Sequence, residues 1–292
     1  MTDTAHLLID SRCELGEGPL WHPQRQQLFY FDINRRTLFA ARAGGSVEGR
    51  WPLEEMASAA AVIDEQTLML ATETGLKRFD LTSRMSETIV AIEADKPGTR
   101  SNDGRCHPSG GYWIGTIGRD SEEDPQGTLY HYRAGELTVL KTPVAIPNAT
   151  CFSPDGAIAY WTDTPTKRIL KCPVDPATGL PNGEWSLFVE VPEDEGYPDG
   201  AVVDSAGYLW SARWGGHRVV RHAPDGSVDR VVHVPVSQVS CPALGGPELK
   251  TLFITTATKN LSAEQLASEK VAGGVFAIEV DVPGQPEPVF QA

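Results

Sequence analysis

Three polar residues lie far apart in the sequence but share one setting, beside glycine or proline. They are Glu17 in Leu-Gly-Glu-Gly-Pro, Asn148 in Ile-Pro-Asn-Ala-Thr and Asp199 in Tyr-Pro-Asp-Gly. Two carboxylates and one amide oxygen form an all-oxygen set that suits a hard divalent cation, with water in the remaining positions. Pro-Asp-Gly is also a common turn sequence. From the residues alone, a cation site and three unrelated turns both stay open.

A second polar cluster runs from Arg100 to Gly104 and reads Arg-Ser-Asn-Asp-Gly. Arginine supplies a fork of donors, and asparagine both donates and accepts, so Arg100 and Asn102 are candidates for binding the hydroxyl groups of a ligand. The alternative is a solvated turn, in which Asn-Asp-Gly is equally at home.

Motifs of several enzyme classes are absent from the sequence. It has no Gly-x-Ser-x-Gly elbow, no Gly-x-Gly-x-x-Gly loop, no phosphate-binding P-loop and no His-Glu-x-x-His pair. The seven histidines are scattered, and no set of nucleophile, base and orienting group is visible. A serine hydrolase is therefore not predicted.

The elements that must position these residues repeat along the chain. Six turn-forming clusters are each followed by a short β-prone run, and equivalent turn residues fall at positions 23, 64, 108, 154, 205 and 247. The steps of 41, 44, 46, 51 and 42 residues between them are typical of a four-stranded propeller blade. The pattern predicts an all-β fold, a six-bladed β-propeller of four-stranded antiparallel blades, with residues 1–292 as a single domain.

Such a ring must close, and its loops must converge on a central channel. We expect residues 6–10 to complete the last blade beside residues 274–280, and residues 262–267 to form a short helix. Glu17, Asn148 and Asp199 are each expected just before the innermost strand of a blade, pointing into the channel mouth.

The composition limits the partners. A formal net charge of −14 argues against nucleic acid and anionic membranes, because phosphates would be repelled. Five cysteines, without Cys-x-x-Cys spacing, indicate neither a disulfide framework nor a zinc knuckle. Because no signal or membrane-spanning segment is visible, we expect a cytoplasmic protein, monomeric or weakly homo-oligomeric, that binds a small molecule.

A longer series of motifs, in order from about residue 10 to 282, resembles the SMP-30/gluconolactonase/regucalcin family. The motifs include LGEGPLW, RSNDG, PNATCFSPDG, YWTDT, YPDGAVVD, GYLWSARWGG, LGGPELKTLFITTA and AGGVFAIEV. Within the family, the chain is most similar to bacterial sugar lactonases of pentose and hexose oxidation, such as the xylonolactonases.

The resemblance implies a six-bladed propeller and hydrolysis of an aldonolactone to the aldonic acid. It also implies one divalent cation (Ca, Zn, Mn, Mg or Fe(II)) held by Glu17, Asn148 and Asp199, with Arg100 and Asn102 binding the substrate. Asp120 corresponds at best to an acidic residue of the family's substrate pocket, and Ile117 stands where the family often has methionine.

Lactone hydrolysis requires an electrophile for the carbonyl, an attacking water and a stabilised oxyanion, all of which a bound cation favours. Asp199 is the expected base for the water, and Trp214 or Trp161 the apolar surface for the sugar. Three alternatives remain: a non-catalytic calcium-binding regulatory protein of the regucalcin type, a lactonase or esterase of non-sugar substrates, and a propeller that docks a protein.

Overall fold

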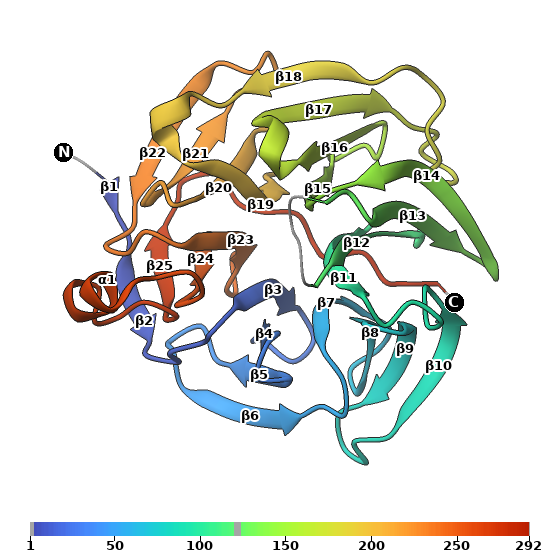
Figure 1. Cartoon of the computed structure of the whole chain (residues 1–292), viewed down its shortest axis with the longest axis horizontal. Coiled ribbons are helices and arrows are strands. Elements are labelled where there is room, and N and C mark those ends of the chain that lie inside the picture. The colour runs from blue at the N-terminus through green and yellow to red at the C-terminus, as the bar shows by residue number, and fades with distance from the viewer. Residues whose placement is uncertain (1–2, 120–123, 292) are drawn as a thin grey trace.

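Six β-sheets stand around a common axis in the computed structural model, which describes residues 3–119 and 124–291 (Figure 1). The innermost strands of the sheets are β3, β7, β11, β15, β19 and β23, and each sheet runs outward from its inner strand. The predicted six-bladed β-propeller is confirmed.

The first three blades follow one another along the chain. Blade 1 consists of β3 (Gly16–His22), β4 (Gln27–Asp32), β5 (Thr37–Ala41) and β6 (Val47–Pro52). Blade 2 consists of β7 (Ala57–Val62), β8 (Thr67–Thr72), β9 (Gly75–Asp80) and β10 (Ser86–Ala91). Blade 3 consists of β11 (Thr99–Cys106), β12 (Tyr112–Gly118), β13 (Gly127–Arg133) and β14 (Glu136–Val144).

The other three blades carry the short helices and the two strands nearest the N-terminus. Blade 4 consists of β15 (Pro147–Phe152), β16 (Ile158–Asp163), β17 (Arg168–Pro173) and β18 (Ser186–Glu190), with 3₁₀ turns at Thr164–Thr166 and Glu193–Glu195. Blade 5 consists of β19 (Tyr197–Val203), β20 (Leu209–Trp214), β21 (Arg218–His222) and β22 (Val228–His233), extended by β1 (Asp3–Thr4). Blade 6 consists of β23 (Val239–Gly245), β24 (Thr251–Thr256), β25 (Val275–Glu279) and β2 (His6–Ile9).

The ring closes as predicted from the sequence. Strand β2 pairs antiparallel with β25, with His6 opposite Ala277, so the N-terminal strand covers the outer edge of blade 6. The helix expected near residue 262 is α1 (Ala263–Ser268), and Ser262 caps it in a reciprocal capping box with Gln265. No helix among the described residues is long and apolar enough to cross a membrane.

Apolar side chains fill the spaces between neighbouring blades. Each of the six buried clusters formed by described residues joins two adjacent blades. Trp21 of blade 1 stacks on Phe253 of blade 6 with ring centroids 5.8 Å apart, and Trp113 of blade 3 meets Phe152 of blade 4 edge-on. This packing holds the inner strands in fixed relative positions. All five cysteines are buried and free.

The turn clusters found in the sequence connect the first and second strands of the blades. The first strand therefore begins, and the second strand ends, at the same end of the ring. We call this end the mouth and the opposite one, where the inner strands finish, the far end. Side chains at the mouth come from the beginnings of inner strands and from the loops that follow second strands.

Candidate metal and substrate site

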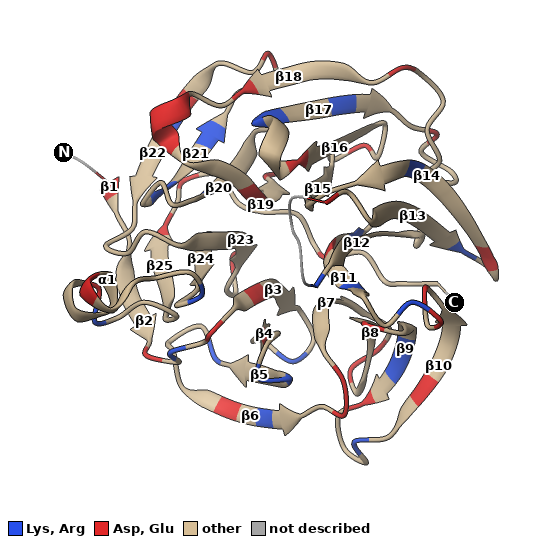
Figure 2. Cartoon of the chain, viewed as in Figure 1, with Lys and Arg blue, Asp and Glu red and all other residues tan. Residues whose placement is uncertain are grey.

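A single pocket at the mouth collects the polar residues singled out in the sequence. The lining residues are Leu15, Glu17, Arg100, Asn102, Ile117, Ile146, Asn148, Thr164, Asp199, Trp214, Lys259 and Asn260. It contains about 490 Å³ of space not filled by atoms, part of it open to solvent, which is within the range of small-molecule sites. Acidic segments of β3 and β19 border the axis there (Figure 2).

β-Bulges place these side chains. The register of each inner strand shifts against its neighbour near the mouth, between Glu17 and Leu20 in β3, Ser101 and Gly104 in β11, Asn148 and Cys151 in β15, and Pro198 and Ala201 in β19. A bulge leaves residues unpaired and redirects their side chains. The residues thus lie inside the first few positions of the inner strands, which corrects the expectation that they precede those strands.

Hydrogen bonds orient the amide of Asn148. Its Nδ2 donates to Oγ1 of Thr164 at 2.9 Å, and the Thr164 hydroxyl donates to the carbonyl of Pro198 at 2.8 Å. Because Nδ2 is engaged on that side, Oδ1 is the atom left to face Asn102 and the pocket. The amide therefore offers an oxygen to the pocket, as a hard cation requires.

Few groups of the protein stabilise the negative charge of the Glu17 carboxylate. The backbone N–H of Gly18 donates to its Oε2 at 3.1 Å. Desolvation, followed by the negative charge of Asp103, raises the pKa of Glu17 to about 8, although Arg100 acts in the opposite direction. A cation beside Glu17 would stabilise the charged carboxylate.

Arg100 and Asn102 form a linked pair. Nη1 of Arg100 donates to Oδ1 of Asn102 at 3.0 Å, while Nδ2 of Asn102 donates to Oδ1 of Asn148 at 3.1 Å and to the carbonyl of Pro147 at 2.9 Å. Asn102 thus contacts the amide oxygen that is a candidate cation ligand. The sequence analysis expected Asn102 to bind the substrate only, whereas its side chain also lies beside Asn148.

Asp103 does not line the pocket but lies behind it. Its Oδ2 accepts a hydrogen bond from the backbone N–H of Thr150 at 2.7 Å, and burial raises its pKa. It is nonetheless close enough to Glu17 to influence that carboxyl.

The donor set fits a divalent cation. Glu17 and the buried side chains of Asn148 and Asp199 come from blades 1, 4 and 5 and line one pocket. Among the described residues, no group of three or more His, Cys, Asp and Glu is arranged to hold a metal. A set of two carboxylates and one amide is a different, harder donor set, which favours Ca²⁺, Mg²⁺ or Mn²⁺ chemistry over a thiolate or imidazole site.

Some expected residues lie elsewhere. Trp161 is buried between blades 3 and 4 and is not a sugar platform, whereas Trp214 lines the pocket. Asp120 lies outside the described residues. Sequence reasoning missed Thr164, Lys259 and Asn260, although one signal was available: all three follow the second strand of a blade, and such loops open at the mouth.

Comparisons with known proteins identify the family of the chain. The family model described as SMP-30/Gluconolactonase/LRE-like region matches residues 15–258. The chain is 38% identical over 280 residues to an L-arabinolactonase of Azospirillum brasilense, covering 94% of this chain and 91% of that protein. It is 32% identical over 290 residues to a 6-deoxy-6-sulfogluconolactonase of Pseudomonas putida, covering 99% of both.

A solved structure from Agrobacterium tumefaciens, described as a calcium-binding protein, regucalcin, superimposes with a TM-score of 0.95 at 35% identity and covers 100% of both chains. That protein therefore shares the six-bladed propeller fold of this chain. The chain belongs to the SMP-30/gluconolactonase family.

Proposed function

We propose that this protein hydrolyses a sugar lactone to the corresponding aldonic acid, with one divalent cation held by Glu17, Asn148 and Asp199. The observation that carries the proposal is the convergence of three oxygen donors from three blades beside Arg100 and Asn102 in one pocket. The lactonase relatives named above support the reaction class.

A divalent cation at this position would polarise the lactone carbonyl and stabilise the negative charge that develops on its oxygen. The protein's own groups supply the remaining steps. Asp199 takes a proton from the attacking water, whose oxygen bonds to the carbonyl carbon. The bond from that carbon to the ring oxygen then breaks, and Asp199 returns the proton to the ring oxygen. Water is added, and the product is a hydroxy acid.

Donors and apolar surfaces around the cation site would orient the sugar. Arg100 and Asn102 of blade 3 can bond sugar hydroxyls from one side of the axis. Lys259 and Asn260 of blade 6 can bond them from the opposite side, because blades 3 and 6 face each other across the six-bladed ring. Trp214 offers an apolar face. Such a pocket favours a hydroxylated lactone over an apolar ester.

A panel of freshly prepared aldonolactones, assayed after chelation and after metal is added back, tests the proposal. We expect hydrolysis well above the spontaneous rate for at least one sugar lactone, lost on chelation and restored by metal. Cation binding without hydrolysis of any lactone would instead indicate a calcium-binding role, as in the name of the Agrobacterium neighbour.

A further inference from the structure

The C-terminal segment, residues 283–291, crosses the far end of the ring. In Figure 1 it passes behind the inner strands, from the side of blades 5 and 6 toward blades 2 and 3. Backbone bonds fasten it at both sides: Gly284 N–H donates to Leu249 on blade 6, and Phe290 N–H donates to Val62 on blade 2. The Phe290 ring packs against Tyr112 and Tyr132 of blade 3.

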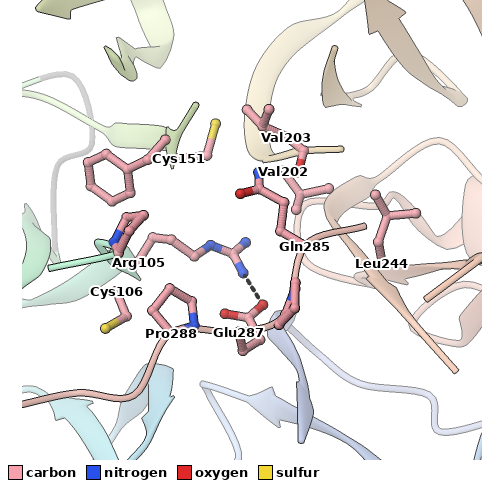
Figure 3. Close-up of a pocket in the computed structure, with 12 residues that line it drawn as sticks. Arg105, Cys106, Cys151, Val202, Val203, Leu244, Gln285, Glu287 and Pro288 are labelled. Atoms are coloured by element: carbon pink, nitrogen blue, oxygen red, sulfur yellow. Dashed lines mark hydrogen bonds and ion pairs between the residues drawn. The ribbon is translucent and has the colours of Figure 1, made fainter. Parts of the chain in front are cut away.

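One charged residue of this segment reaches the axis. Oε1 of Glu287 lies 3.3 Å from Nη1 of Arg105 on β11, and both side chains are only 11% exposed (Figure 3). Nη2 of Arg105 donates to the carbonyl of Ala201 on β19 at 3.2 Å. Arg105 therefore extends from blade 3 across to blade 5, with Glu287 as its acidic partner.

This pair lies behind the proposed cation site. Arg105 follows Asn102 by three residues on β11, and Asp103, between them, accepts a hydrogen bond from the backbone N–H of Thr150, two residues after Asn148. The Ala201 carbonyl that accepts the hydrogen bond from Arg105 lies two residues after Asp199 on β19. The Arg105 guanidinium is therefore anchored on the inner strand that carries Asp199, where its charge can act on a cation held at the mouth.

We propose that Glu287 is a positioning residue for the cation site: it holds and neutralises Arg105, whose positive charge would otherwise oppose a cation at the mouth. This inference rests on the cation site proposed above. The C-terminal segment is then more than a cover for the core, because it supplies a negative charge to a site built by other blades.

Substitutions of Glu287 and Arg105 distinguish an effect of charge on cation affinity from an effect of packing. In Glu287→Gln the Arg105 charge loses its partner, so cation affinity should fall by at least ~3-fold. In Arg105→Gln a positive charge disappears, so affinity should rise. The double variant should return close to the parent. Damage to the fold would lower affinity in both single variants.

Calorimetric titration with Ca²⁺ and Mn²⁺ measures these affinities directly, with all variants compared in one buffer at one pH. Glu287→Asp keeps the charge while disturbing the packing, and should stay near the parent even if Arg105→Gln proves unable to fold. Glu248→Gln removes an exposed charge from a far-end turn and should have no effect.

Two results would overturn the inference while leaving the cation site intact. One is parent-like affinity in Glu287→Gln, and the other is an equal loss in Glu287→Gln and Glu287→Asp. If the parent protein bound neither ion, and bound none of Mg²⁺, Zn²⁺ and Fe²⁺ either, the cation site would be wrong, and this inference would be wrong with it.

Discussion

Nδ2 of Asn148 donates a hydrogen bond to Oγ1 of Thr164 at 2.9 Å, and this bond decides which end of the Asn148 amide faces the pocket. The Thr164 hydroxyl in turn donates a hydrogen bond to the carbonyl of Pro198 at 2.8 Å, one residue before Asp199. Thr164 thereby couples two proposed cation ligands from neighbouring blades without being a ligand itself.

Thr164→Val should therefore weaken cation binding. Valine keeps the shape of threonine but removes the acceptor that fixes the amide, and groups that orient a ligand are typically worth about 10-fold or more in metal affinity. Calorimetry on the metal-free protein measures the loss. Thr164→Ser, which retains the hydroxyl, is the matched control and should restore most of the affinity; equal losses in both variants would contradict the orienting role.

Substitutions of Arg100 and Asn102 should separate substrate binding from cation binding. Arg100→Ala removes charge-assisted donors, so KM for the lactone should rise about 10-fold or more, without weaker cation binding. Asn102→Ala should raise KM and also lower cation affinity, because Asn102 contacts Oδ1 of Asn148. Steady-state kinetics with a parallel metal titration compares the two, and a strong loss of cation affinity in Arg100→Ala would refute this division of roles.

Asp199→Asn tests the proposed base. The substitution keeps the size and an oxygen ligand but removes charge and basicity. Cation affinity should fall moderately, whereas kcat at saturating metal should fall by at least ~10²-fold. Near-normal turnover at saturating metal would leave Asp199 as a ligand only, and the water would then need activation by the cation alone or by another acid such as Asp103.

Acid should destabilise the protein partly through His222. Burial, followed by the positive charge of Arg213, lowers the pKa of His222 to about 4, and its Nε2 lies 2.9 Å from Nη2 of Arg213. His222 therefore takes up a proton at a higher pH in the unfolded chain than in the folded protein. The stability contributed by neutral His222 is complete above pH ~6.5 and is lost as the pH falls toward 4.

Urea unfolding at a series of pH values between about 7 and 5 measures this loss. His222→Gln should give a shallower decline of the unfolding free energy with acid than the parent, and the exposed His6→Gln should not. An unchanged slope in His222→Gln would show that other groups carry the acid sensitivity.

The sequence was most informative where local chemistry repeats. Turn clusters at six equivalent positions were sufficient to predict the number of blades. The N-terminal strand, which has no partner near it in the sequence, was sufficient to predict the ring closure seen between β2 and β25. Local patterns report such features because strands and turns depend on neighbouring residues.

The finer geometry of the site was not accessible in the same way. The bulges that unpair Asn102 and Asp199 depend on register between two strands, which composition does not reveal. The same limit applies to Asn102, whose bond to Asn148 spans 46 residues, and to Glu287, which reaches Arg105 from 182 residues away. Trp161 is a case in which the sequence pattern misled: it was expected to contact the sugar, but it is a core residue between blades 3 and 4.

The central claim is that one cation held by Glu17, Asn148 and Asp199 is required for lactone hydrolysis. The most direct test adds metal stepwise to chelated protein while bound ion per chain and hydrolysis of a responsive aldonolactone are measured in the same samples. Activity should rise in proportion to bound ion and level off at one ion per chain, and Glu17→Gln should shift both curves together. Full turnover in protein free of bound ion would contradict the requirement for the cation.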